Sequence, residues 1–144
     1  MDTTSLKQLL DACFTAKHIV ETLPQLPKGM KPRHIHVLDS VSRVCTEQGE
    51  CRVSDVSTRL NITMPSNTKL VQELENLGLL EKYADREDKR VILLALTKEG
   101  KAHVKKHVED FQRTWTERLG HVSDKQARDA IWVIEQLSDT MPGK

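Results

Sequence analysis

The sequence is poor in aromatic residues, in cysteine and in net charge, and each shortage narrows the classes of protein to which it can belong. Only two Phe, two Trp and one Tyr occur among 144 residues, so aliphatic side chains must fill the core. Three cysteines are an odd number, which does not suggest a disulfide framework. A chain of this length fits one compact domain, and we expect residues 1–144 to form a single domain.

Long hydrophobic runs are also absent from the sequence. No stretch approaches the roughly 18 to 20 apolar residues that a membrane span requires. The first residues lack the basic and then apolar run of a signal peptide. We therefore expect no membrane partner and a cytoplasmic location.

Patterns that carry catalysis are missing as well. No nucleophile, base and orienting group stand at a catalytic spacing, and we find neither a glycine-rich phosphate loop nor a strong metal motif. Asp, Glu and His are scattered in the way that is typical of solvated helix faces. We predict that the protein is not an enzyme and has no cofactor.

Apolar residues at helical spacing predict amphipathic helices at both ends of the chain. The first helix covers about residues 4–23, and a segment with three prolines and one glycine follows it at 23–32. Near the other end, Ser123 and Gln126 have the form of a capping box that opens a last helix. Between them, one apolar stripe is formed by Val104, Val108, Phe111, Trp115 and Leu119.

The middle of the chain predicts a helix-turn-helix. A helix over about 33–46 is followed by a short helix over 54–60 and a tight turn at 61–63. Thr63 can cap a third helix, which Gly78 closes.

A strand, a turn and a second strand follow directly, at 79–83 and 90–96, with a highly charged tip at 84–89. The pattern therefore predicts a small hairpin placed immediately after the helix-turn-helix.

The start of the third helix carries short polar side chains, as a helix that enters the major groove of DNA must do. They are Ser66, Asn67, Thr68 and Lys69, with Gln72 one turn further on. Asn and Gln can pair with adenine edges, and Lys can reach guanine acceptors or phosphate. An ordinary helical hairpin with a solvated face is the alternative interpretation, but the charged hairpin downstream favours double-stranded DNA as the partner.

The hairpin tip mixes basic and acidic residues. Arg86, Lys89 and Arg90 can reach phosphates or enter a narrow minor groove. The acids between them reduce the local field, but a carboxylate can also orient an arginine through a bidentate pair. The alternative is a solvated turn whose charges keep an edge hairpin soluble.

The formal net charge of +1 argues weakly against a nucleic-acid binder. The local placement of Lys and Arg sets the phosphate contacts, so this balance does not exclude DNA binding. It predicts modest affinity with few phosphate contacts.

Two segments around the predicted hairpin share a pattern with a known family. They are Leu77-Gly78-Leu79-Leu80-Glu81-Lys82 and Asp88-Lys89-Arg90-Val91-Ile92-Leu93-Leu94-Ala95-Leu96-Thr97-Lys98-Glu99-Gly100. They resemble the MarR family of bacterial transcription regulators, whose pattern is Leu-x-x-x-Gly, a charged wing that ends in Asp-x-Arg, an apolar strand and Leu-Thr-x-x-Gly. The order of helices on both sides also agrees with the family.

The resemblance implies a mainly α fold with a small β-wing. A winged helix-turn-helix lobe would cover residues 33–99, and a helical dimerisation region would cover 1–28 and 101–144. It further implies an obligate homodimer in which Arg90 enters the minor groove with Asp88 as its anchor. Many members are repressors that small phenolic or other aromatic ligands release. We therefore expect a sequence-specific DNA-binding regulator, a repressor released by a small-molecule effector.

Two further motifs leave a regulator that responds to an oxidant or to zinc as an alternative. Cys13 and Phe14 resemble the Cys-Phe pair of the family's peroxide-sensing branch, in which tyrosines stabilise the thiolate. The only tyrosine here is Tyr83, in the predicted wing, so a small core hydrophobe is the competing interpretation of Cys13.

His103 and His107 are four residues apart on one predicted helix and could share a metal ion. Some zinc-sensing members of the family use such a pair, and His34 or His36 with Glu21 could supply further ligands. Solvated surface histidines are the alternative. A winged-helix module that binds another protein instead of DNA is a further function to which the low net charge points.

Overall fold

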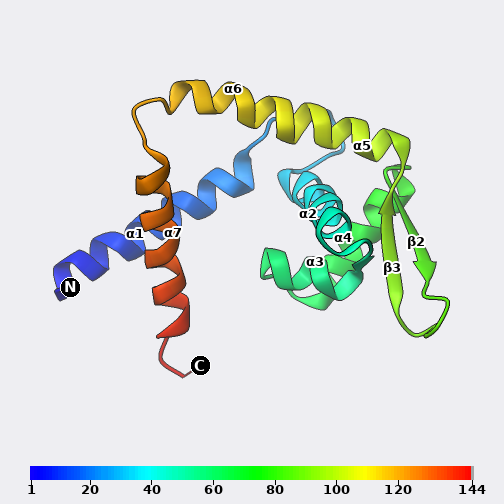
Figure 1. Cartoon of the computed structure of the whole chain (residues 1–144), viewed down its shortest axis with the longest axis horizontal. Helices are drawn as coiled ribbons and strands as arrows, with labels where there is room; N and C mark the ends of the chain where they lie inside the picture. Colours follow the sequence, from blue (N-terminus) through cyan, green and yellow to red (C-terminus); the bar gives the residue numbers. More distant parts are fainter. Residues whose placement is uncertain (144) are drawn as a thin grey trace. The chain divides into compact units, whose positions relative to one another are not determined.

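The computed structural model describes residues 1–143 and confirms the mainly α fold with a small β-wing (Figure 1). The chain divides into two compact units, of which the first covers Met1–Phe111 and the second begins at Gln112. The predicted lobe at 33–99 lies within the first unit. In this unit α5 (Lys98–Val104) packs against α2 (Pro32–Gln48) and β3 (Ile92–Leu96).

The helix-turn-helix consists of α3 (Val53–Leu60) and α4 (Met64–Asn76), both packed against α2. Thr63 caps α4 as predicted, because its Oγ1 accepts a hydrogen bond from the Ser66 backbone N–H at 3.3 Å. Asn61 ends α3 in the left-handed conformation with φ of 54°. The core of the lobe is aliphatic, as the shortage of aromatic residues required, and its fully buried members include Ile35, Leu38, Val41, Val56, Leu74 and Leu94.

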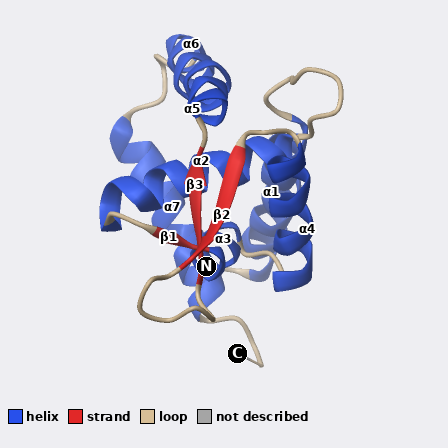
Figure 2. Ribbon diagram, turned by 90° about the vertical axis from the view of Figure 1, so that its right-hand side faces the viewer, coloured by secondary structure: helices blue, strands red, loops and turns tan. Residues whose placement is uncertain are grey.

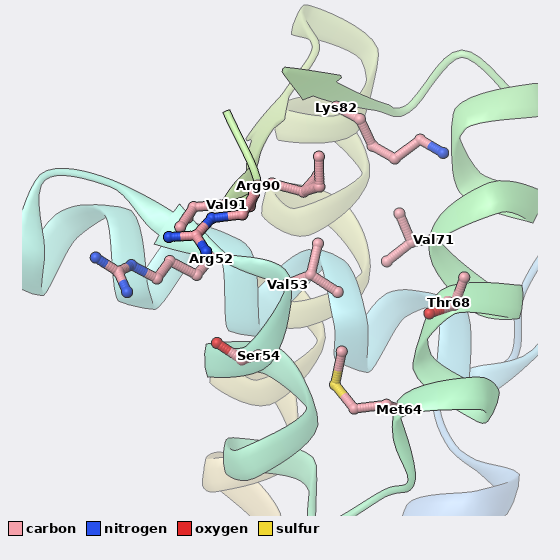
Figure 3. Close-up of a pocket in the computed structure, with 10 residues that line it drawn as sticks. Arg52, Val53, Ser54, Met64, Thr68, Val71, Lys82, Arg90 and Val91 are labelled. Atoms are coloured by element: carbon pink, nitrogen blue, oxygen red, sulfur yellow. The ribbon is translucent and has the colours of Figure 1, made fainter. Parts of the chain in front are cut away.

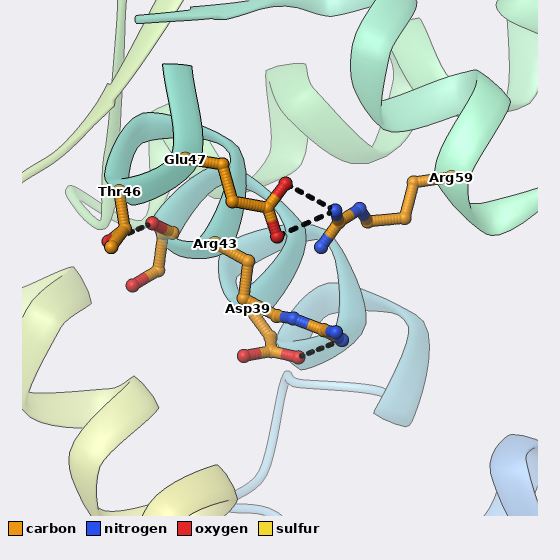
Figure 4. Close-up of polar contacts among 6 residues, drawn as sticks. Asp39, Arg43, Thr46, Glu47 and Arg59 are labelled. Atoms are coloured by element: carbon orange, nitrogen blue, oxygen red, sulfur yellow. Dashed lines mark hydrogen bonds and ion pairs between the residues drawn. The ribbon is translucent and has the colours of Figure 1, made fainter. Parts of the chain in front are cut away.

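A second contact between α2 and α3 is polar (Figure 4). The Arg59 guanidinium on α3 donates to both carboxylate oxygens of Glu47 on α2, at 3.1 and 2.8 Å. Two turns before Glu47 on α2, Asp39 lies 3.9 Å from Arg43, and burial raises the pKa of the Asp39 carboxyl above the ordinary value. The Arg59–Glu47 pair links the short α3 to the longer α2, whereas the Asp39–Arg43 pair lies within α2.

The sheet has three antiparallel strands in the order β1 (Cys51–Arg52), β3, β2 (Leu80–Ala84), drawn in red in Figure 2. In the wing, Leu80 pairs with Leu96 and Ala84 with Ile92. The second strand of the wing begins two residues later than predicted, because a turn occupies the residues before it. In this turn the Asp85 N–H donates to Val91 O at 3.0 Å and the Val91 N–H donates to Asp88 O at 2.9 Å.

Thr97 joins the wing to α5 in a compact junction. Its hydroxyl donates to Gly78 O at 2.7 Å and accepts from the Gly100 N–H at 3.1 Å. Its backbone N–H donates to Leu79 O at 3.2 Å. The end of α4, the end of β3 and the start of α5 therefore meet at one residue.

The helix after Thr97 is not regular. A π-helical turn, η1 (Lys105–Asp110), lies between α5 and α6 (Phe111–Arg118). Of the apolar stripe that we predicted, Val104 and Val108 are buried, whereas Leu119 is exposed. The second unit contains α7 (Asp124–Asp139), which opens with the predicted capping box of Ser123 and Gln126.

Two helices have large apolar side chains that are exposed to solvent. Among the described residues, neither α1 (Thr3–Thr22) nor α7 contains a buried one. Phe14 on α1 is 72% exposed and Trp132 on α7 is 61% exposed. None of the helices in the described part of the chain is long and apolar enough to cross a membrane.

Candidate nucleic-acid interface

The exposed surface of α4 is built from polar side chains one turn apart. Thr68, Lys69 and Gln72 are exposed, and Ser66 is half-buried in the first turn, where its hydroxyl accepts from Thr63 Oγ1 at 3.0 Å. The opposite side of the same helix carries the buried Leu70, Val71 and Leu74. Four of the five side chains that we predicted on this helix are thus exposed or half-buried.

Asn67 requires a correction. Its side chain has no exposed surface, and its Nδ2 donates to Val53 O at the start of α3, at 2.8 Å. The predicted base contact does not fit this placement, because the amide is turned into the lobe and away from any groove. The reason is its position in the helix, which puts it on the same side as the buried Leu70 and Val71.

Gln72 connects α4 to the wing. Its Oε1 accepts from Lys82 Nζ on β2 at 3.1 Å, and its Nε2 donates to Asn76 Oδ1 at 3.1 Å. Lys82 also lies 3.4 Å from Glu75. The Gln72 amide is therefore oriented before any partner arrives.

The tip of the wing holds Arg90 in a fixed orientation. The Arg90 Nε and Nη2 donate to the two carboxylate oxygens of Asp88 at 3.0 and 3.1 Å, and the Arg90 backbone N–H donates to Asp88 at 3.1 Å. These hydrogen bonds lower the pKa of the Asp88 carboxyl below its ordinary value. The Arg90 side chain is nevertheless 91% exposed. The geometry matches the bidentate pair that we predicted, and Arg86 and Lys89 are exposed beside it.

A groove of about 420 Å³ separates α4 from the wing (Figure 3). Its apolar lining includes Val53, Val71 and Ile92. Arg52 and Arg90 lie on one side of the groove, and Lys82 lies on another. Three basic side chains, on β1, on β2 and just before β3, thus surround one concave surface next to α4.

Sequence reasoning missed Arg52 and Lys82. Arg52 pairs with Leu93 and Lys82 with Leu94 on β3, and both line the groove beside α4. The sequence indicated strands at these places but not how they pair or how they lie against α4, so it could not bring these two side chains to the same groove. Arg52 also lies close enough to Asp88 to contribute to the lowered pKa of that carboxyl.

The cysteines are distributed over separate environments. Cys13 is half-buried on α1, next to the exposed Phe14, while Tyr83 lies on β2. Burial raises the pKa of the Cys45 thiol, and it raises the pKa of the Cys51 thiol to about 12. Cys45 and Cys51 are therefore held as neutral thiols at neutral pH.

His103 and His107 stack on each other, with ring centroids 5.4 Å apart and an angle of 28° between the planes. Burial, and then the neighbouring His103 and Lys106, lower the pKa of His107. The further ligands that we predicted are engaged elsewhere: His34 with Glu73, His36 with Val20 O and Glu21 with Arg33. Within residues 1–143, no group of three or more His, Cys, Asp or Glu side chains is placed to hold a metal ion.

A helix-turn-helix followed by a two-stranded wing defines the class of winged helix-turn-helix proteins, and this chain has that architecture. Within this class the sequence matches the model of the MarR family over residues 28–91.

Known proteins of this kind match most of the chain. The chain is 22% identical over 131 residues to the "uncharacterized HTH-type transcriptional regulator YwhA" of Bacillus subtilis (strain 168), covering 90% of this chain and 93% of that protein. The PcaV transcriptional regulator from Streptomyces coelicolor, solved in complex with its natural ligand, superposes with a TM-score of 0.71 at 18% identity, over 97% of this chain and 96% of that one. S. aureus MepR, solved as a DNA complex, superposes with a TM-score of 0.69 at 17% identity, over 98% of this chain and 99% of that one.

Proposed function

We propose that the protein is a sequence-specific, DNA-binding transcription regulator that acts by binding rather than by catalysis. The observation that carries this proposal is Arg90, an exposed cation that both oxygens of Asp88 hold in one orientation. A guanidinium fixed in this way suits insertion into a narrow minor groove, where the negative potential of DNA is strongest.

The recognition helix supplies the second contact. Thr68, Lys69 and Gln72 present hydroxyl, ammonium and amide groups to the major groove, and Ser66 stands at the helix start, where a phosphate is favoured. Arg52 and Lys82 would contact phosphates along the groove between α4 and the wing, together with Arg86 and Lys89 at the tip. The DNA complex of MepR supports this use of the fold.

The protein would act as a homodimer. The exposed apolar side chains of α1 and α7 cost free energy in water, at about 25 cal/mol for each Å² of apolar surface, and a second copy of the chain would cover them. A dimer with two-fold symmetry would place two recognition helices on two DNA half-sites about one helical turn apart.

The regulator would be a repressor that a small effector releases. The support is the ligand complex of PcaV, a regulator with the same fold. A ligand that binds the DNA-free conformation better than the DNA-bound one would shift the population toward the free protein.

The test compares Arg90→Ala with Asp88→Ala on a duplex that the wild-type protein enriches from a random-sequence library. Arg90→Ala should weaken binding about tenfold to a hundredfold, as expected for the loss of one groove-reading arginine. Asp88→Ala leaves the cation but frees it, so affinity for the enriched duplex should fall less while affinity for random DNA rises.

Fluorescence anisotropy over a salt series measures both effects, and circular dichroism checks the fold. Lys98→Ala, on the exposed start of α5 outside the groove, is the matched loss of one positive charge. Normal binding by Arg90→Ala would show that the wing does not contact DNA.

A further inference from the structure

A buried histidine on α2 is hydrogen-bonded to α4, the helix that carries the proposed DNA-reading side chains. His34, in the first turn of α2, is 1% exposed. Its Nδ1 accepts a hydrogen bond from the Lys31 backbone N–H at 2.9 Å, and its Nε2 lies 2.9 Å from Glu73 Oε2 on α4. Because a backbone N–H can only donate, the proton of the neutral ring must be on Nε2. The ring therefore donates to the Glu73 carboxylate.

This ring performs two tasks with its two nitrogens. Through Nδ1 it completes the capping box of α2, a task that Glu or Gln usually performs at this position. Through Nε2 it makes a charge-assisted hydrogen bond to Glu73 on α4, whose side chain is 35% exposed. Glu73 directly follows Gln72, which belongs to the proposed DNA-reading surface.

The same turn of α2 is also bound to the end of α1. Arg33 lies 3.4 Å from Glu21, and the His36 Nε2 donates to Val20 O at 2.6 Å. Three side chains within four residues, Arg33, His34 and His36, thus bind α1 on one side and α4 on the other. A displacement of the end of α1 would reach α4 through one helical turn of α2.

We propose that His34 is a positioning residue for DNA binding, which fixes the recognition helix to the α1–α2 junction through Glu73. It does not touch DNA itself, because it is buried. The inference rests on the proposed function, since it assigns to His34 the task of setting the angle at which α4 meets the groove. It also gives the end of α1 a direct mechanical route to the DNA-reading surface.

Two substitutions separate the two tasks of the ring. Asparagine carries Oδ1 at the same bonded distance from the backbone as Nδ1, so His34→Asn can still cap α2 but is too short to reach Glu73. Glutamine carries Nε2 at the position of the imidazole Nε2, so His34→Gln can still donate to Glu73. Both variants lose the ring, Asn being one methylene shorter than Gln, and only His34→Asn loses the link to α4.

The measurement is affinity for the duplex enriched on the wild-type protein and for a random duplex of equal length. His34→Asn should bind the enriched duplex about tenfold more weakly than His34→Gln, with equal binding of both variants to random DNA. Long-range ¹H–¹⁵N correlation spectra of the wild type should show His34 with its proton on Nε2. Equal affinities of the two variants, or a proton on Nδ1, would overturn the proposal.

Hydrogen exchange tests the link without DNA. The α4 amides should exchange about tenfold faster in His34→Asn than in His34→Gln, while the α3 amides change equally in both variants. If the wild-type protein enriches no duplex, the proposed function fails, and the exchange rates still decide whether His34 holds α4. Equal α4 exchange in the two variants would show that it does not.

Discussion

Asn67 shows how a single buried amide shapes the DNA-facing helix. It lies in the first turn of α4, and its Nδ2 bonds to Val53 O at the start of α3. Its Oδ1 is buried and has no hydrogen-bond partner among residues 1–143. The side chain thus joins the two helices of the motif at the point where they approach each other.

Asn67→Ala should therefore lower the free energy of unfolding by about 1–3 kcal/mol, because a fully buried side chain and its hydrogen bond to Val53 O are lost. Urea denaturation followed by circular dichroism measures this change. Thr68→Ala, at the exposed next position, is the matched control and should change stability by less than about 0.5 kcal/mol. Similar stabilities of the two variants would contradict the assigned contact.

Cys51 gives a prediction that depends on pH. Its thiol is fully buried, and burial raises its pKa from 9.0 to about 12. The folded protein therefore keeps this proton at pH values at which the unfolded chain has released it. The contribution of the thiol to stability is complete below about pH 9 and is lost as the pH rises toward 12.

The same shift predicts slow alkylation, because the thiolate is the reactive form. At pH 8, iodoacetamide should modify Cys51 about a thousandfold more slowly in the folded protein than in 8 M urea, from the pKa difference alone. Peptide mass spectrometry over time measures the rate at each cysteine. Equal rates in buffer and urea would show that Cys51 is accessible.

At the scale of whole elements, the sequence predicted correctly those helix starts and strands that depend on residues close to one another in the chain. Thr63, Ser123 and the wing pattern predicted helix starts and strands, because a cap or a turn depends on neighbours within a few residues. The π-helical turn at 105–110 was missed, since its apolar residues keep an ordinary helical spacing. The link from His34 to Glu73 and the burial of Asn67 also escaped prediction, because both depend on how helices pack.

Gly100 tests the junction between the wing and α5. A Cβ at this position would clash with the carbonyl oxygen of Leu79. Because that oxygen belongs to the backbone, it cannot easily move aside. Gly100→Ala should destabilise the protein by about 1–3 kcal/mol through overpacking. Thermal unfolding measures the effect, with Gly120→Ala as control, where a Cβ would meet only Glu117 O at 3.8 Å. A Gly100→Ala protein as stable as this control would contradict the close approach.

At the scale of the whole molecule, the exposed apolar side chains of α7 predict the oligomeric state. Ile131 and Ile134, three residues apart on one helix, are 55% and 52% exposed. Replacing both by Glu should convert the proposed dimer to monomer, because two buried charges without partners cost several kcal/mol. Sedimentation velocity measures the mass of the species in solution.

Gln136→Glu places the control charge on the other side of the same helix and should leave the dimer intact. A wild-type protein that sediments as a monomer would contradict the proposed dimer. A double variant that remains dimeric would show that α7 lies outside the interface.

The acids in the wing have a kinetic consequence for a DNA-binding protein. The tip from Asp85 to Arg90 contains three acidic and three basic residues, so its charges cancel at a distance, although Arg90 stays available at close range. Such a wing adds little to the attraction that holds a protein on arbitrary DNA. The protein would therefore leave wrong sites quickly and search a chromosome through many brief encounters, dwelling only where the groove fits Arg90.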